Sequence, residues 1–289
     1  MSDLLTIADL SADALSEILD LSARRDHGRP LDGKGVAMLF QKPSARTRNS
    51  MEMAVAQLGG HPVAIRSDEV GLGTRETVED VARTLACYHA LIAARVTDHK
   101  VLEAMAAAVD TPMLNMLSDS DHPLQALADL LTVQELLGTL EGATIAYVGD
   151  ANNVARSLAE GCAKLGVALR VASPDGYCFA DPNALGLFQT ADPAEAVRGA
   201  RIVYTDVWVS MGQDGEAEAR TDALAPYRVD EALMAKADDA WFLHCLPARR
   251  GEEVSDAVMD GPKSAIWRQA ANRMHSARGA MLWMLGGGA

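Results

Sequence analysis

Short apolar runs alternate with helical patterns along this chain, and this alternation constrains the fold more than any other feature. The run GVAMLF at 35–40 is followed by a helical pattern up to Gly59 and Gly60. Three more apolar runs separated by helical patterns come next, at 61–65, 90–95 and 111–117. Strands that alternate with helices pair in parallel, so this half of the chain predicts a parallel sheet covered on both faces.

The same alternation begins again after residue 140. Apolar runs alternate with helical patterns here too, the runs at 142–150, 168–174, 201–207 and 241–247 and the helices at 152–165, 193–199 and 230–236. A polar stretch rich in Gly and Glu follows residue 207, and we expect it to be a loop. The predicted fold class is α/β, with two similar domains, each a parallel sheet flanked by helices, joined by interdomain helices.

The two halves meet at a long helical pattern that starts at HPLQ and ends near residue 138. We predict a first domain over 1–132 and a second over 133–267. The segment 268–289 reads as an amphipathic helix with no strand after it. We expect this C-terminal helix to pack back on the first domain.

Charge and composition exclude several classes of protein. The formal net charge is −14 and the pI is near 4.9, which argues against a nucleic-acid or membrane-surface partner. No apolar run approaches the length of a membrane span. The four cysteines show no zinc-like spacing, so we expect reduced thiols, no metal site and a cytoplasmic protein.

An arginine-rich segment directly follows the first apolar run. Ser44, Arg46, Thr47 and Arg48 lie where a strand ends and a helix begins. Unpaired N–H groups at a helix start attract anions, and a guanidinium matches phosphate oxygens. These residues therefore suggest a phosphate site, although a serine cap with two surface arginines would give the same pattern.

Other polar residues fall at the ends of predicted strands, where ligands bind in open parallel sheets. They are Arg95, His122 with Gln125, Asn152 with Asn153, Asp206 and Cys245. All but Cys245 have an ordinary structural explanation as a solvated loop residue or a helix cap. A catalytic pair of Cys245 with His244 is disfavoured, because neighbours on a strand point to opposite faces. The GDANN segment resembles a dinucleotide-binding turn but lacks its glycine pattern, so a dinucleotide oxidoreductase is disfavoured.

Taken together, these segments resemble the aspartate/ornithine carbamoyltransferase family, and its ornithine-type members in particular. The resemblance covers nearly the whole chain and keeps the order of five motifs: PSARTR at 43–48, HPLQ at 122–125, DVWVSMG at 206–212, HCLP at 244–247 and ANR at 271–273. It implies a first domain that binds carbamoyl phosphate, a second that binds ornithine, and a homotrimer or a multiple of it. It implies no metal or organic cofactor.

The resemblance also implies which residues act. Carbamoyl phosphate would be held by Ser44, Ala45, Arg46, Thr47, Arg48, Arg95, His122, Gln125, Cys245, Leu246 and Arg273. Ornithine would be held by Asn153, Asp206, Ser210 and Met211. The catalytic residues would be Arg46, Arg95, His122, Asp206 and Cys245. The implied reaction moves the carbamoyl group to the δ-amine of L-ornithine and gives L-citrulline and phosphate.

Some positions depart from the family pattern. Ala45 stands where a threonine is usual, and Gly71 where many bacterial members have a glutamine. Two alternatives stay open. One is a carbamoyltransferase for another amine, such as putrescine or an N-acylornithine. The other is a non-catalytic paralogue that binds a metabolite.

Overall fold

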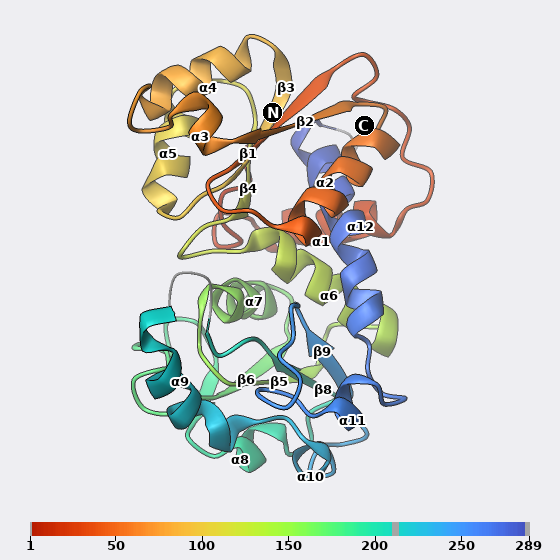
Figure 1. The fold of residues 1–289 in the computed structure, drawn as a ribbon. Coiled ribbons are helices and arrows are strands. Elements are labelled where there is room, and N and C mark those ends of the chain that lie inside the picture. The colour runs from red at the N-terminus through yellow and green to blue at the C-terminus, as the bar shows by residue number, and fades with distance from the viewer. Residues whose placement is uncertain (1, 210–213, 287–289) are drawn as a thin grey trace. The chain divides into compact units, whose positions relative to one another are not determined.

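A computed structural model describes residues 2–209 and 214–286. Contacts divide the chain into two compact units: unit 1 is Met1–Leu131 with Ala271–Ala289, and unit 2 is Thr132–Ala270. Each unit is built on one parallel sheet (Figure 1). The predicted α/β class with two parallel sheets is therefore confirmed. Two long helices, α6 (Pro123–Leu137) and α12 (Ile266–Met284), contribute residues to both units.

Unit 1 contains a four-stranded sheet in the order β2-β1-β3-β4. Its strands are β1 (Gly35–Phe40), β2 (His61–Arg66), β3 (His89–Arg95) and β4 (Met113–Leu117). Its other helices are α1 (Ala12–Ala23), α2 (Ala45–Gln57), α3 (Ser67–Val70), α4 (Val78–Ala86) and α5 (His99–Ala107). The central strand β1 is buried from Val36 onward, which explains why its sequence is a continuous apolar run.

Helices cover both faces of the unit 1 sheet. Ala37 and Leu39 of β1 pack with Ile92 and Ala94 of β3 against α4 and α5. Figure 1 shows α4 and α5 on one side of this sheet and α2 on the other. Helix starts follow local capping chemistry, as at Ser11, the N-cap of α1, whose Oγ accepts the Ala14 N–H at 3.1 Å.

Unit 2 contains a five-stranded sheet in the order β7-β6-β5-β8-β9. Its strands are β5 (Thr144–Val148), β6 (Ala168–Ala172), β7 (Phe188–Thr190), β8 (Ile202–Thr205) and β9 (Trp241–His244). Its helices are α7 (Asn153–Lys164), α8 (Pro193–Val197), α9 (Ala217–Leu224), α10 (Glu231–Met234) and α11 (Asp256–Met259). Helices α8, α10 and α11 share one apolar cluster with β5 and β9.

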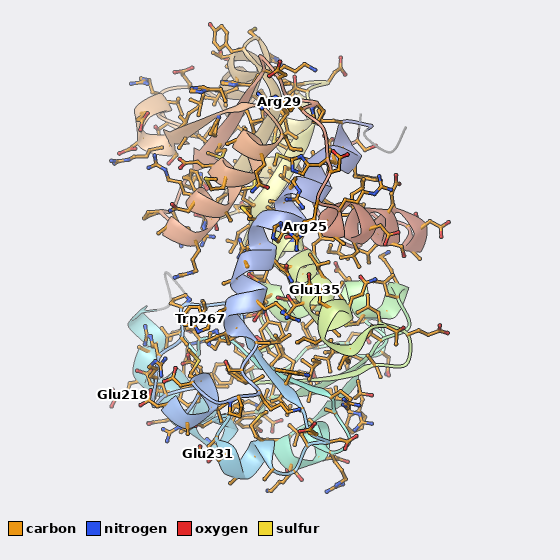
Figure 2. All side chains as sticks on the ribbon, turned by 90° about the vertical axis from the view of Figure 1, so that its right-hand side faces the viewer. Arg25, Arg29, Glu135, Glu218, Glu231 and Trp267 are labelled. Carbon is orange, nitrogen blue, oxygen red and sulfur yellow. The ribbon has the colours of Figure 1, made fainter. Side chains whose placement is uncertain are left out.

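The polar stretch after residue 207 was expected to be a loop, and this prediction is wrong for part of it. Part of it forms α9, whose buried residues are Arg220 and Leu224. Its other side chains are exposed or partly exposed, and Figure 2 shows Glu218 of α9 and Glu231 of α10 at the surface of unit 2. A helix with so few buried apolar positions carries no apolar periodicity, which is why the sequence did not reveal it.

The edge strand β7 was also missed, because three residues are too few to show a strand pattern. Within the described ranges, no helix combines the length and apolar character needed to cross a membrane.

Candidate active site

The first group of predicted site residues begins where β1 ends and α2 starts. Ser44 is the N-cap of α2, and its Oγ accepts the Thr47 N–H at 3.3 Å. The Ser44 hydroxyl also donates to Thr47 Oγ1 at 3.1 Å. Ala45, the first helical residue, is exposed. The cap therefore orders the helix start and, with it, the hydroxyl of Thr47.

Thr47 accepts hydrogen bonds from two buried arginines of unit 1. Arg95, the last residue of β3, donates through Nη1 to Thr47 Oγ1 at 3.2 Å. Arg273 of α12 donates through Nη2 to the same oxygen at 3.5 Å. Because Thr47 Oγ1 accepts from both guanidiniums, one small hydroxyl holds two cations side by side. Residues 226 positions apart in sequence thus share one hydrogen-bonding centre.

Two predicted residues come from the start of α6. Gln125 is buried, and its Oε1 accepts a hydrogen bond from Arg273 Nη1. His122 is also buried, and burial together with Arg273 and Arg95 lowers its pKa well below the ordinary value. His122 is therefore neutral at pH 7, and a neutral imidazole carries one N–H donor of the kind that polarises a carbonyl group.

The cluster is strongly cationic. Burial, with Arg273 and Arg46 nearby, lowers the pKa of Arg95 to about 10, so Arg95 keeps its charge at pH 7. Among the described residues, neither Arg95 nor Arg46 forms an ion pair, although Arg46 is exposed. Because Arg46, Arg95 and Arg273 hold positive charges close together, the cluster is suited to an anion with more than one negative charge.

Arg48 is not drawn into this cluster. Its Nε donates to Glu52 Oε1 at 2.7 Å, one helical turn further along α2, and both side chains are partly exposed. The arginine-rich segment thus splits in two. Arg46 contributes to the field around Arg95, and Arg48 makes an ordinary i,i+4 surface pair.

A cavity of about 310 Å³ in unit 1 lies elsewhere. It is lined by Lys34, His89, Pro112 and neighbouring residues, which precede or begin β1, β3 and β4. These are the amino ends of the strands. The arginine cluster instead follows their carboxyl ends, where open parallel sheets bind ligands.

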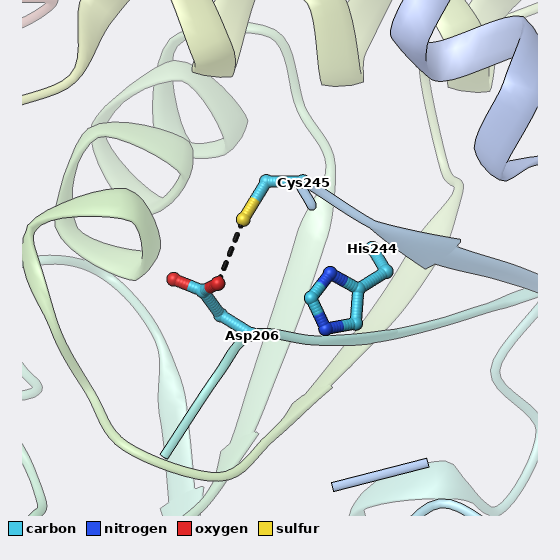
Figure 3. A group of neighbouring side chains, drawn as sticks. All are labelled: Asp206, His244 and Cys245. Carbon is cyan, nitrogen blue, oxygen red and sulfur yellow. Dashed lines mark hydrogen bonds between the residues drawn. The ribbon is translucent and has the colours of Figure 1, made fainter. Parts of the chain in front are cut away.

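The second group of predicted residues surrounds Asp206 of unit 2. Asp206 Oδ1 accepts from Cys245 Sγ at 2.8 Å (Figure 3). The same oxygen accepts from the backbone N–H of Val207 at 2.8 Å. Its Oδ2 accepts from Asn152 Nδ2 at 2.8 Å. Asp206 is 6% exposed, and no basic side chain pairs with it among the described residues. A buried carboxylate held by neutral donors is suited to an ammonium group.

The two asparagines at the start of α7 have different places. Asn152 is the N-cap, and its Oδ1 accepts the N–H groups of Val154 and Ala155. Its Nδ2 must therefore face Asp206. Asn153, the predicted ligand of ornithine, is the first residue of the helix and is partly buried. The predicted residues Ser210 and Met211 lie outside the described residues.

Cys245 and Leu246 follow β9 in a turn. Leu246 has a positive φ of 62°, and its N–H donates to His244 Nδ1 at 2.9 Å. The other ring nitrogen of His244 faces the buried Glu253 at 3.1 Å. The hydrogen bonds described for His244 and for Cys245 thus go to different partners, in keeping with the opposite directions of neighbouring side chains on a strand.

The donor atoms of Asp206, His244 and Cys245 all lie within 4.8 Å of one another, a spacing that a metal ion could bridge. Both ring nitrogens of His244 are already engaged, by Leu246 and Glu253. The Cys245 thiol donates to Asp206. Hydrogen bonds therefore already use these groups, and we assign no metal to them.

One buried ion pair near Asp206 was missed. Arg220 of α9 pairs with Asp150, donates from Nε to the Trp208 carbonyl at 2.7 Å, and lies 4.9 Å from the centre of the Tyr177 ring. Burial raises the pKa of Asp150 to about 6 in spite of Arg220, and Asp206 adds to the rise. The position of Asp150 after a predicted strand was the available signal, whereas Arg220 lay in the presumed loop.

The two halves of the chain match the two domains of a known protein family. Residues 2–135 match the carbamoyl-P binding domain of aspartate/ornithine carbamoyltransferase, and residues 141–284 match its Asp/Orn binding domain. The chain belongs to the aspartate/ornithine carbamoyltransferase family. The predicted resemblance is confirmed.

Individual relatives match over nearly their whole length. The ornithine carbamoyltransferase of Anoxybacillus flavithermus is 43% identical, over 98% of this chain and 96% of its own. The anabolic ornithine carbamoyltransferase of Pyrococcus furiosus is 44% identical, over 99% of this chain and 96% of its own.

Solved structures of the family share the fold. Ornithine carbamoyltransferase from Pyrococcus furiosus superposes with a TM-score of 0.94 at 42% identity, covering 99% of this chain and 97% of that chain. The enzyme from Thermus thermophilus gives 0.91 at 42% identity, with 98% of each chain covered.

Proposed function

We propose that this protein is an ornithine carbamoyltransferase, which transfers the carbamoyl group of carbamoyl phosphate to the δ-amine of L-ornithine and yields L-citrulline and phosphate. The observation that carries the proposal is the match of 98–99% of the chain to relatives that bear this name. The two charged clusters supply a physical reason, because one suits a phosphate dianion and the other an ammonium group.

Carbamoyl phosphate is the ligand of the unit 1 cluster in this proposal. Ser44, Ala45 and Thr47 present the start of α2 to the phosphate, with its unpaired N–H groups. Arg46, Arg95 and Arg273 neutralise its charge, and Arg48 adds to the positive field from the surface. His122 and Gln125 surround the carbamoyl group, since the neutral imidazole donates to its carbonyl oxygen.

Ornithine is the ligand of unit 2 in this proposal. Asp206 accepts the ammonium group, and its hydrogen bonds from Asn152 and Cys245 keep the carboxylate oriented. Asn153, Ser210 and Met211 are the further ornithine ligands that the family resemblance implies. Cys245 and Leu246 would border the place where the δ-amine meets the carbamoyl carbon.

The reaction needs a neutral amine and a stabilised oxyanion. The lone pair of the δ-nitrogen forms the new C–N bond, and the carbonyl electrons move to oxygen. Arg46, Arg95 and His122 stabilise this oxyanion, a contribution whose loss costs about 100- to 1000-fold in rate. As the oxyanion collapses, the C–O bond to phosphate breaks and phosphate leaves with that electron pair. The departing phosphate takes up the one proton that the nitrogen gives up.

An acceptor panel tests this proposal. Purified protein is given carbamoyl phosphate with L-ornithine, putrescine, N-acetylornithine or L-aspartate, and the carbamoylated product is quantified. We expect a clear preference for L-ornithine. A preference for another amine would reassign unit 2, and a folded protein that carbamoylates none of them would favour a metabolite-binding paralogue.

Assembly and location are part of the same proposal. Family resemblance predicts a homotrimer or a multiple of it, acting in the cytoplasm. Light scattering of the purified protein gives the mass directly. A mass that is not a multiple of three 30.7 kDa chains would contradict this prediction.

A further inference from the structure

We propose that Asp129, a fully buried carboxylate of α6 outside the predicted site, is a positioning residue that fixes the amide of Gln125 and, through it, the guanidinium of Arg273. The inference deepens the proposed function, since it concerns the proposed carbamoyl phosphate site. Asp129 lies one helical turn after Gln125, and Gln125 Nε2 donates to Asp129 Oδ1 at 2.7 Å. The opposite end of the same amide accepts from Arg273 Nη1.

The two neighbours make the amide orientation unambiguous. An ionised carboxylate only accepts hydrogen bonds, and a guanidinium only donates them. A flipped Gln125 would place its carbonyl against the Asp129 oxygen and its NH₂ group against Arg273. Both contacts would be repulsive in a site from which water is excluded, because Gln125 and Asp129 are 1% exposed or less.

The orientation of the Gln125 amide in turn determines how the Arg273 guanidinium is held. The Arg273 guanidinium is held by Gln125 Oε1 at one nitrogen and by Thr47 Oγ1 at the other. A correctly oriented carbonyl from Gln125 thus helps Thr47 Oγ1 to aim this cation at the start of α2. Without Asp129 the amide is free to rotate by half a turn, and that acceptor becomes a donor.

The proposed role of Asp129 predicts weaker anion binding when its charge is removed, which is the opposite of what charge alone predicts. Removing a negative charge near an anion site should by itself strengthen anion binding. If Asp129 orients Gln125, the isosteric change Asp129→Asn should instead weaken binding. Losing one correctly placed charged hydrogen bond corresponds to about tenfold or more in affinity. A purely structural role would lower the unfolding temperature and leave the affinity of the folded protein unchanged.

The affinity test uses calorimetric titration with carbamoyl phosphate and, separately, with inorganic phosphate. Wild type, Asp129→Asn and Asp121→Asn are compared. Asp121 is a buried carboxylate just before α6 whose Oδ2 accepts from Ser120 at 2.6 Å, so its variant reports the loss of a nearby charge. We expect a dissociation constant at least about tenfold higher for Asp129→Asn only. An unchanged or lower constant would overturn the inference.

A second measurement needs no variant of Asp129. In protein labelled with ¹⁵N-glutamine, the side-chain signal that disappears in Gln125→Met belongs to Gln125. We expect this amide to resist exchange with D₂O, because Nε2 is bonded to a buried carboxylate. Exchange as fast as that of surface glutamines would contradict the fixed orientation. A wild type that binds neither ligand would refute the proposed function, while this exchange rate still decides the orientation.

Discussion

The two units present sites of opposite charge. In unit 1, Arg46, Arg95 and Arg273 lie close enough for Arg46 and Arg273 to lower the pKa of Arg95. In unit 2, Asp206 lies among neutral donors, namely Asn152, Cys245 and a backbone N–H. Among the described residues, neither Arg46 nor Arg95 has an ion pair, and Asp206 pairs with no basic side chain. From this difference we infer that an anion binds in unit 1 and a cation in unit 2.

The two sites also differ in how the buried charge is tolerated. Asp206 receives three hydrogen bonds from neutral groups, which replace part of its lost hydration. Arg95 shares one hydroxyl with Arg273, a second cation. The unit 1 cluster is therefore the less satisfied of the two, and we expect ligand binding there to have the larger effects.

The largest expected effect is on turnover in the Arg46→Ala variant. Arg46 lies in the field of Arg95 and carries no ion pair of its own among the described residues. Its loss should reduce the rate of citrulline formation by about 100- to 1000-fold at saturating substrate concentrations, the range for removing one oxyanion donor. Circular dichroism should show an unchanged fold.

Arg48→Ala is the matched comparison within the same helix. Arg48 is engaged with Glu52 at the surface, so its removal should change the rate by less than about fivefold, in keeping with an exposed pair. Equal losses in the two variants would show that Arg48 is as close to the reacting group as Arg46. Near-normal turnover in Arg46→Ala would remove its proposed role.

The next largest effect is expected in unit 2, on the KM for L-ornithine. Asp206→Asn keeps the shape but removes the charge that pairs with the ammonium group. The KM for L-ornithine should rise about 10- to 100-fold, the value of a charged hydrogen bond, while the KM for carbamoyl phosphate changes little. Glu218→Gln, which removes one exposed charge from unit 2, is the control. If the KM for carbamoyl phosphate rose instead, the division between the units would be wrong.

A smaller effect concerns stability. A ligand that binds only the folded protein stabilises it by about 2.7 kcal/mol at 100 times its dissociation constant. Phosphate should therefore raise the unfolding temperature of the wild type, because it neutralises crowded arginines. Arg95→Met should lose most of this shift. An equal shift in both proteins would place the bound phosphate away from Arg95.

The smallest effect is a pH dependence in unit 1. The pKa of His122 is lower in the folded protein than in the unfolded chain, so the unfolded chain binds the extra proton as the pH falls below about 6.5. The stability that neutral His122 contributes is present above that pH and is lost below it. In His122→Gln, the loss between pH 6.5 and 5 should be smaller by up to about 1.4 kcal/mol per pH unit. If urea unfolding gave the same dependence of stability on pH for the wild type and for His122→Gln, that result would contradict the lowered pKa of His122.

Much of the fold could be predicted because buried elements have recognisable apolar patterns in the sequence. The apolar runs of β1 and β3 are continuous, and their residues are buried on both faces. Helix α9 left no such signal, because its buried residues include the charged Arg220. The short edge strand β7 left none either. Local patterns thus revealed the elements that build the cores and missed those whose burial is slight or polar.

The site was predictable in part. The position of polar residues after strands located Thr47, Arg95 and Asp206. The pairing of Gln125 with Arg273 joins residues 148 positions apart, and no local pattern reports such a contact. Family resemblance supplied Arg273, but neither resemblance nor pattern pointed to Asp129 or Arg220. Asp129 contacts Gln125 and Arg220 contacts Asp150, and these contacts become visible only when the chain is folded.

One experiment tests most directly whether the two sites take part in one reaction. ¹³C-labelled carbamoyl phosphate is mixed with the protein in an NMR tube, first alone and then with L-ornithine, while ¹³C and ³¹P spectra are recorded. The account predicts that phosphate release above the spontaneous rate begins only when L-ornithine is added, with one citrulline formed for each phosphate released. Phosphate released at the same rate without L-ornithine, or without matching citrulline, would contradict it.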